Sequence, residues 1–522
     1  MLLALLVAVL SVLLGAALSF VPGTSRAVLG YMRTFATLAA VAVVVTHLLP
    51  EALHELGPLS ILLFLAGWFA PALAHFIGQR STSGRTQHAV LEAGYWGLVI
   101  HHVADGIGLG AYTRLPSDQG SHLDVIVALA AHTVPLIAVV SLAYRTTFGA
   151  RSAVLRSLGL AAASVVGILL SNLAAASTIE GFSPIIAAVA AGLLLHVVTH
   201  DLTEDPAHGA LARSLDLVVA ALGVSVSLLG VLHSEEPSTR EFMFGLIQLS
   251  ERTALVILVA LLVAAFSLRT VDRGSKWARS ALPAGILGAE SVLLSIALFG
   301  FEAALLRLLV TVLAVAFVLG SKAAEATAAE AAPRQRWRAR VAESLESAGP
   351  WLVLGLLIGA LLTSVPLAAL QRHSLTPLVE LLGVALVANL TPVAAPAAVL
   401  IAAGFAGLGL SPGAIFLFAT LAPMAHAAKS ALKARALATA ACLAIAFAAD
   451  RFKLPTTPLD GALSQGDLGL RAAITLAVLL VFGVWLRSAR LWLATIVPPP
   501  PHEHEHSHDV HGPHDAHGHH HH

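Results

Sequence analysis

The amino-acid sequence predicts an all-α fold, a polytopic transmembrane helix bundle of about 15–16 spans, and its composition and apolar runs lead to this prediction. Of its 522 residues, 57% are hydrophobic and 11% are charged, and the mean hydropathy is +0.84. A soluble protein of this length needs more polar surface. Apolar runs of about 18–25 residues recur along the chain, and helices of this length cross roughly 30 Å of hydrocarbon. The runs are rich in Leu, Ala and Val and lack the alternation of a barrel strand, which favours helices.

The first half, residues 1–235, contains eight apolar segments that we interpret as spans. They lie near residues 2–20, 33–51, 58–78, 90–112, 123–143, 153–174, 183–200 and 213–233. The first segment has no basic leading region and no clear cleavage site, so we interpret it as a span rather than a secretory signal. With the N-terminus outside, the outer loops up to residue 233 hold only Arg114, and the inner loops and span ends hold Arg26, Arg33, Arg80, Arg85, Arg145, Arg151, Arg156 and Arg213. This asymmetry predicts an eight-span unit with both ends outside.

A polar stretch, His233–Glu241, separates the first half from a second transmembrane domain at residues 240–497. Its predicted spans lie near 243–268, 281–299, 302–320, 350–371, 376–404, 411–428, 434–450 and 468–487, with an inner loop rich in Ala, Glu and Arg at 321–348. Segment 376–404 contains Thr391 and Pro392, and proline breaks helices. Irregular backbone at membrane depth is tolerated only where protein buries it or where it lines a cavity. We therefore expect a broken or re-entrant helix in this segment.

Residues 498–522 are expected to form a disordered, histidine-rich, metal-binding tail. The tail holds eleven histidines between His502 and His522, interleaved with Glu, Asp and Gly. Such a tract binds zinc, copper or nickel loosely and concentrates metal near a pore. A purification tag is the alternative interpretation, although interleaved acidic residues are unusual for a tag.

Ionisable side chains recur inside the predicted spans, where each costs roughly 2.5–3.5 kcal/mol at the bilayer centre. In the second span, His47 and Glu51 are four residues apart and His54 follows, so the three share a helical face. Pro50 frees the carbonyl of Thr46 and adds an oxygen to the same neighbourhood. The alternative is the interfacial end of a helix, where polar groups cost little.

The fourth and fifth spans carry the next two ligand candidates. His101 and Asp105 are four residues apart, and an imidazole with a carboxylate on one helical face forms a half-site for a divalent first-row metal. A structural His–Asp hydrogen bond is the alternative. His132 precedes Pro135, which frees the carbonyl of Ala131. A lone buried histidine is usually structural, but the neighbouring histidine-bearing span favours a ligand role.

The seventh span ends with His196 and His200, four residues apart, which is a chelating spacing on a helix. These two side chains could also lie at the membrane edge. Four helices of one unit thus carry histidines, with carboxylates or prolines beside them, and together they predict a metal path through a bundle.

The motifs in residues 1–235 resemble those of the ZIP family of metal transporters, which has eight spans with both termini outside. His101 to Gly106 reads His-His-Val-Ala-Asp-Gly, similar to the family's His-Asn/Ser-x-x-Asp/Glu-Gly. His132 to Leu136 reads His-Thr-Val-Pro-Leu, similar to His-Glu-x-Pro-His/Glu. The second span, with His47-Leu-Leu-Pro-Glu51, also resembles the family. The resemblance implies that His101, Asp105 and His132 are ligands of the transport site.

Three positions depart from the family pattern. His102 replaces the usual Asn or Ser and could bind a second metal ion. Thr133 and Leu136 stand where the family has ligands, so a two-metal centre loses two of them. The side chains that could compensate are His102, His196 and Glu51. Alternatively, the metal or the mechanism differs, or this half no longer transports.

The second half resembles, more weakly, the arsenical/metal permease-like proteins. The resemblance rests on residues 349–359, on Thr391-Pro392 and on residues 409–413. Cys442 is the only cysteine, so the thiols that some members use are absent. Candidate pathway residues are Glu290, Glu302, Arg307, His426 and Lys429. For Glu302 and Arg307, an ion pair that satisfies buried charge is the favoured interpretation.

The sequence therefore predicts transport of a divalent metal ion, with Zn²⁺ as the favoured ion, and no enzymatic activity. Two alternatives stay open: a membrane-embedded zinc hydrolase that recruits the histidines and Asp105, and a metal-sensing membrane subunit. ZIP relatives move metal toward the cytoplasm and permease relatives export it, so the direction is open. The expected partners are divalent metal ions and the lipid bilayer, with a homodimer as a candidate assembly. The net charge of zero gives no sign of nucleic-acid binding. The high content of Ala, Leu and Arg favours a bacterial protein of the inner membrane.

Overall fold

The computed structural model describes residues 2–21, 26–57, 59–81, 86–112, 123–173, 176–200, 209–233, 237–271, 289–319, 337–363, 365, 377–427, 432–452 and 467–496. Nearly all of these residues lie in helices, and none of them lies in a β-strand. The prediction of an all-helical fold is therefore confirmed for this part of the chain. Six of the described stretches are long and apolar enough to cross a membrane: Leu2–Ser19, Gly30–Leu56, Ala150–Leu173, Pro237–Val263, Val341–Thr363 and Asp467–Arg487. The predicted total of about 15–16 spans stays a prediction.

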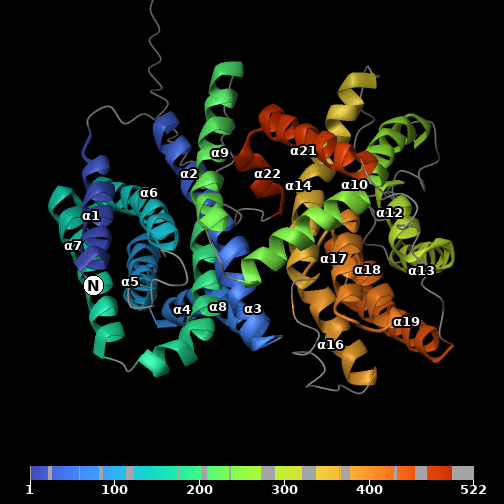
Figure 1. Ribbon diagram of the computed structural model, residues 1–522, viewed down its shortest axis with the longest axis horizontal. Coiled ribbons are helices and arrows are strands. Elements are labelled where there is room, and N and C mark those ends of the chain that lie inside the picture. Colours follow the sequence, from blue (N-terminus) through green and yellow to red (C-terminus); the bar gives the residue numbers. More distant parts are fainter. Residues whose placement is uncertain are drawn as a thin grey trace, which may run out of the picture.

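Each of the eight spans predicted in the first half falls on a helix of the structure, the second on three consecutive elements. The elements are α1 (Leu2–Ser19), α2 (Arg26–Val43), η1 (Val44–Leu48), α3 (Leu49–Leu56), α4 (Leu59–Ser81), α5 (Thr86–Tyr112), α6 (Leu123–Phe148), α7 (Ala150–Leu173), α8 (Ala176–His200) and α9 (Ala210–His233). In Figure 1 these blue to green helices occupy one side of the molecule.

Several packed helix pairs in the first half run parallel. On α5 and α7, Glu92 contacts Arg156, and ten residues after Glu92 the ring of His102 contacts Ser164. Close contacts in the same order along both helices also make α1 parallel to α6 and α2 parallel to α9. The two members of every pair have the same direction in the predicted alternation of spans, so the packing agrees with that alternation.

The second predicted span is interrupted by a π-helical turn, η1, in which the N–H of Leu49 donates to the carbonyl of Val44. Pro50 has no N–H for the carbonyl of Thr46. The hydroxyl of Thr239, on the first helix of the second half, donates to that carbonyl at 3.1 Å. Single π-turns are frequent at functional sites, and this one contains His47.

The second half consists of α10 (Pro237–Val271), α12 (Ala289–Phe299), α13 (Phe301–Leu319), α14 (Trp337–Thr363), α16 (Pro377–Leu390), α17 (Ala395–Gly407), α18 (Pro412–Ala427), α19 (Leu432–Arg451), α21 (Asp467–Arg487) and α22 (Ala489–Ile496). Two features differ from the sequence prediction. The loop expected at 321–348 is helical from Trp337 onward, because Ala, Glu, Arg and Leu are strong helix formers in spite of their charge. The short helix α22 was not predicted, since eight residues give no clear periodic signal.

The break predicted in segment 376–404 is confirmed, because α16 ends at Leu390 and α17 begins at Ala395. The guanidinium of Arg435, on α19, donates to the carbonyl of Asn389 at 3.0 Å and so covers the exposed end of α16. Residues 395–402 of α17 are all buried. At 13 residues, α17 is shorter than the roughly 20 residues of a full span, and the protein core surrounds it.

The two halves are joined by a buried carboxylate, Asp216 of α9, which is 0% exposed. It accepts hydrogen bonds from the hydroxyls of Thr34 and Ser488, each at 2.7 Å, and from the N–H of Ala489 at 3.2 Å. Ser488 separates α21 from α22 with a φ of 84°. Nearby, Arg213 donates to the carbonyl of Leu486 at 3.0 Å. Figure 1 shows α9 beside α22 at this junction between the halves.

Candidate metal centre

The ligand pair predicted on the fourth span lies on α5. Nε2 of His101 is 3.2 Å from Oδ2 of Asp105, and the two side chains are 0% and 11% exposed. The spacing of four residues on a regular helix brings the two groups together without any tertiary constraint. The geometry suits both a metal half-site and a structural hydrogen bond.

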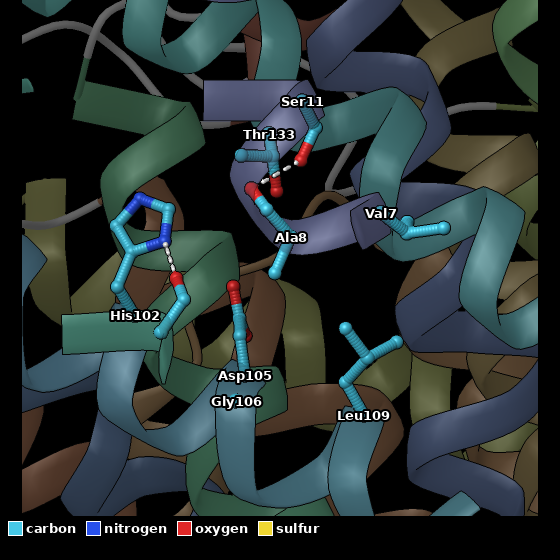
Figure 2. Close-up of a pocket in the computed structure, with 9 residues that line it drawn as sticks. Val7, Ala8, Ser11, His102, Asp105, Gly106, Leu109 and Thr133 are labelled. Carbon is cyan, nitrogen blue, oxygen red and sulfur yellow. Dashed lines mark hydrogen bonds between the residues drawn. The ribbon is translucent and has the colours of Figure 1, made fainter. Parts of the chain in front are cut away.

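A small cavity of about 20 Å³ lies directly beside this pair. It is lined by Val7, Ala8, Ser11, His102, Asp105, Gly106, Leu109, Thr133 and Ser164, from helices α1, α5, α6 and α7. A cavity needs roughly 10–15 Å³ to hold one water molecule, so this one accommodates a water molecule or a small ion. Figure 2 shows the carboxylate of Asp105 pointing toward the side of the cavity where Thr133 and Ser11 lie.

His102 forms one wall of the cavity and is 1% exposed. Its Nδ1 is 3.1 Å from the hydroxyl oxygen of Ser164 on α7, and that hydroxyl donates to the carbonyl of Leu160 at 3.3 Å. Because a hydroxyl has one proton, Ser164 accepts from Nδ1 of His102 when it donates to Leu160. The lone pair of the neutral ring is then on Nε2, which is a nitrogen that can bind a metal.

The approach of α7 to α5 depends on two glycines that face each other. A Cβ atom at Gly106 would lie 2.2 Å from the carbonyl oxygen of Ser164, and one at Gly167 would lie 2.1 Å from that of Val103. No larger residue fits at either position without moving a helix backbone. The glycine that ends the fourth-span motif therefore has a packing role, which brings Ser164 to His102.

Ser164 and Ser11 were not predicted as site residues. A signal for Ser164 is present in the sequence, because Ser157, Ser164 and Ser171 recur every seven residues on α7. All three side chains are buried, at 4%, 4% and 2% exposure. A seven-residue spacing keeps side chains on one helical face, so buried hydroxyls line the side of α7 that faces the other helices.

Of the remaining predicted ligands, some lie away from the cavity beside His101, and the others have side chains outside the described part of the structure. His47 is 5% exposed on η1, and Glu51 is half-buried on α3. His196 packs edge-on against the ring of Trp68, with 5.8 Å between ring centroids. The side chains of His132 on α6 and His200 on α8 are outside the part of the structure that is described, as is the tail at 498–522.

Among the side chains that the structure describes, no three His, Cys, Asp or Glu residues gather closely enough to hold a metal ion. The described ligand candidates His47, Glu51 and His196 do not line the cavity beside His101. What the structure brings together is His101 with Asp105, and His102 with three hydroxyl-bearing side chains.

In the second half, the predicted Glu302–Arg307 ion pair is wrong. Glu302 is exposed at the start of α13, whereas Arg307 is 5% exposed. The guanidinium donates to the carbonyl of Ala419 at 3.1 Å, to that of Ser291 at 2.9 Å and to the hydroxyl of Ser295 at 2.6 Å. Pro423 leaves the Ala419 carbonyl without its helical donor, and Arg307 supplies one.

The three other candidates of the second half are less informative. Glu290 is buried in the first turn of α12, at 8% exposure. The side chain of His426 and the whole of Lys429 are outside the described residues.

The residues that the structure describes form an all-helical fold with several helices of membrane-spanning length, two of which, α1 and α7, line the cavity together with α5 and α6. The surface of this small cavity is mostly apolar, and five polar side chains contribute to its lining. Comparison with known proteins finds no match to a family model, to a curated protein or to a solved structure. The likenesses to ZIP transporters and to permeases therefore remain resemblances of short motifs.

Proposed function

We propose that the first half carries a divalent metal ion, with Zn²⁺ as the favoured substrate, across the membrane through a site on α5 and α6. The observation that carries this proposal is the buried His101–Asp105 pair beside a cavity of about 20 Å³ whose lining includes Asp105, His102 and three hydroxyl-bearing side chains. Ionisable side chains inside a membrane protein are costly and usually mark an ion path.

The chemistry of the lining favours an intermediate, first-row divalent ion. Imidazole and carboxylate are both zinc ligands, and the hydroxyls of Ser11, Thr133 and Ser164 add neutral oxygens. No thiol contributes, because Cys442 is buried in α19 of the other half. His132 lies one residue before Thr133 on α6 and is our further candidate ligand.

The size of the cavity favours transport over hydrolysis of a lipid. A space for one small ion or water molecule does not admit a lipid headgroup beside a zinc-bound water. The cavity lies between the parallel pair α1 and α6 and the parallel pair α5 and α7. A movement of one pair relative to the other would change the access of an ion to the cavity. Alternating access in transporters is largely such a movement of one bundle against another.

The test is zinc entry into liposomes that contain the purified protein and an internal zinc-sensitive dye. We expect a saturable dye signal that empty liposomes lack. Tight zinc binding without entry would contradict transport and would support a sensing subunit. Zinc-dependent release of fatty acid or headgroup from the liposome lipid, again without entry, would support the hydrolase.

A further inference from the structure

The four helices that line the cavity are tied together again at one end of the bundle, at a group of residues that we call the Glu92 cluster: Ser19, Glu92, Tyr95, Tyr144, Arg145 and Arg156. At its centre, Nη2 of Arg156 on α7 is 2.5 Å from Oε1 of Glu92 on α5. The guanidinium also lies 4.5 Å from the ring centroid of Tyr95 and 5.5 Å from that of Tyr144 on α6.

The same cluster includes α1. Arg145, next to Tyr144, donates to the carbonyl of Ser19 at the end of α1. Its guanidinium lies 5.3 Å from the ring centroid of Phe20, and the hydroxyls of Ser19 and Ser141 are 2.9 Å apart. Each of the four helices that contribute to the cavity thus contributes to the cluster.

The register of the helices places the cluster between the cavity and one end of the bundle. Glu92 precedes His102 by ten residues and Arg156 precedes Ser164 by eight. At about 1.5 Å per residue these spacings put the cluster about 12–15 Å from the cavity along the helix axes. Between them lies a packed apolar layer that includes Leu98, Ile137 and Leu160, all buried. An ion that leaves the cavity in this direction passes only if the four helices separate.

The Glu92–Arg156 ion pair is weak enough to break and form again. Glu92 and Arg156 are 36% and 31% exposed, and ion pairs with such solvent access are weak. The two cation–aromatic contacts add to the pair without burying a charge completely. Arg145 and Arg156 are among the arginines whose uneven distribution between the loops predicts that this end of the helices faces the inner side.

We propose that the Glu92 cluster is the closed inner gate of the first half. The Glu92–Arg156 ion pair and the two tyrosines hold α5, α6 and α7 together, and their separation opens the cavity toward that side. The identity of the ion that passes rests on the proposed zinc transport, whereas the gate itself does not.

The gate is tested by the rate at which a thiol reagent reaches the cavity. Cys442 is the only cysteine in the sequence and is 0% exposed, so a Cys442→Ala background with Thr133→Cys places one thiol at the cavity wall. The protein is held in lipid nanodiscs, where both faces are open to a small methanethiosulfonate reagent. We expect Glu92→Gln to raise the labelling rate about two- to fivefold, the factor by which loss of a partly exposed ion pair shifts an opening equilibrium.

The control is Asp467→Asn, which breaks the exposed Asp467–Arg471 pair on α21 and should leave labelling unchanged. A Glu92→Arg, Arg156→Glu double variant restores the opposite charges and should bring the rate back toward the parent value. The gate is overturned if Glu92→Gln labels at the rate of the Asp467→Asn control, or if the charge exchange labels as fast as Glu92→Gln.

Zinc entry, measured on the same variants without Thr133→Cys, separates the gate from the proposed substrate. A higher labelling rate in Glu92→Gln together with an altered rate of zinc entry supports both. A higher labelling rate without zinc entry in any variant supports the gate and contradicts zinc as the substrate.

Discussion

The imidazole of His101 lies 3.2 Å from the carboxylate of Asp105, one helical turn later on α5, and neither side chain faces open solvent. A neutral or positively charged imidazole beside a carboxylate is an arrangement that a divalent cation can enter by replacing the proton between them. The pair is therefore the first place at which the proposed function can be tested by substitution.

Asp105→Asn keeps the size of the side chain but removes its negative charge. Because the ion then loses a charged ligand, we expect zinc affinity to fall at least about tenfold. Equilibrium dialysis measures this best on a variant that ends at residue 497, since the tail histidines bind zinc independently. Unchanged affinity would mean that the His101–Asp105 contact is a structural hydrogen bond.

Gly106→Ala should destabilise the protein by about 1–3 kcal/mol, the usual cost of overpacking. The new methyl group would meet the carbonyl of Ser164 at 2.2 Å, so α5 and α7 must move apart. Gly108→Ala on the same helix is the matched control, because a Cβ there meets nothing within 4 Å. Thermal unfolding in detergent measures both, and equal melting temperatures would contradict the close packing of α5 on α7.

Asp216→Ala should weaken the contact between the two halves. The substitution removes the acceptor of the Ser488 hydroxyl and of the Ala489 N–H, at about 1–3 kcal/mol for each unsatisfied buried donor, whereas Thr34 keeps the carbonyl of Gly30 as an acceptor at 3.2 Å. Asp467→Asn, an exposed carboxylate on α21, should change stability by less than about 0.5 kcal/mol. A comparison of the two unfolding curves checks this, and similar curves would show that Asp216 does not join the halves.

Zinc entry should slow as the external pH is lowered from about 7.5 to about 5.5, through the ordinary histidine range near pH 6.5. Imidazole binds a metal only when it is unprotonated, so protons compete with zinc at the site. The internal pH is kept constant so that the dye response does not change. A rate that is flat or rises with acidity would contradict an imidazole ligand in the path.

The sequence predicted the helices well because most of them are long apolar runs with charged or proline-containing ends. Pro392 correctly indicated the break between α16 and α17, since the loss of one N–H is a local effect. The charged residues after Trp337 were misinterpreted as a loop, because a polar helix and a polar loop have similar composition. The short α22 lacks enough residues for a periodic signal.

The site was predictable only where it is local. His101 and Asp105 meet because they are one turn apart, which the sequence specifies directly. Ser164 and Ser11 reach the cavity through helix packing, and the packing depends on contacts such as Gly106 against Gly167 that no single segment indicates. The hydrogen bond from the hydroxyl of Thr239 to the carbonyl of Thr46 likewise depends on how the second half packs against the first.

The most direct test of metal passage through the cavity is the initial rate of zinc entry into liposomes for His101→Ala relative to the parent protein. His54→Ala is the matched control, because His54 is 33% exposed next to Glu55 and does not line the cavity. We predict that His101→Ala lowers the rate at least about tenfold while His54→Ala leaves it unchanged. Equal rates for the parent protein and His101→Ala, at equal amounts of folded protein, would contradict a path through the His101–Asp105 site.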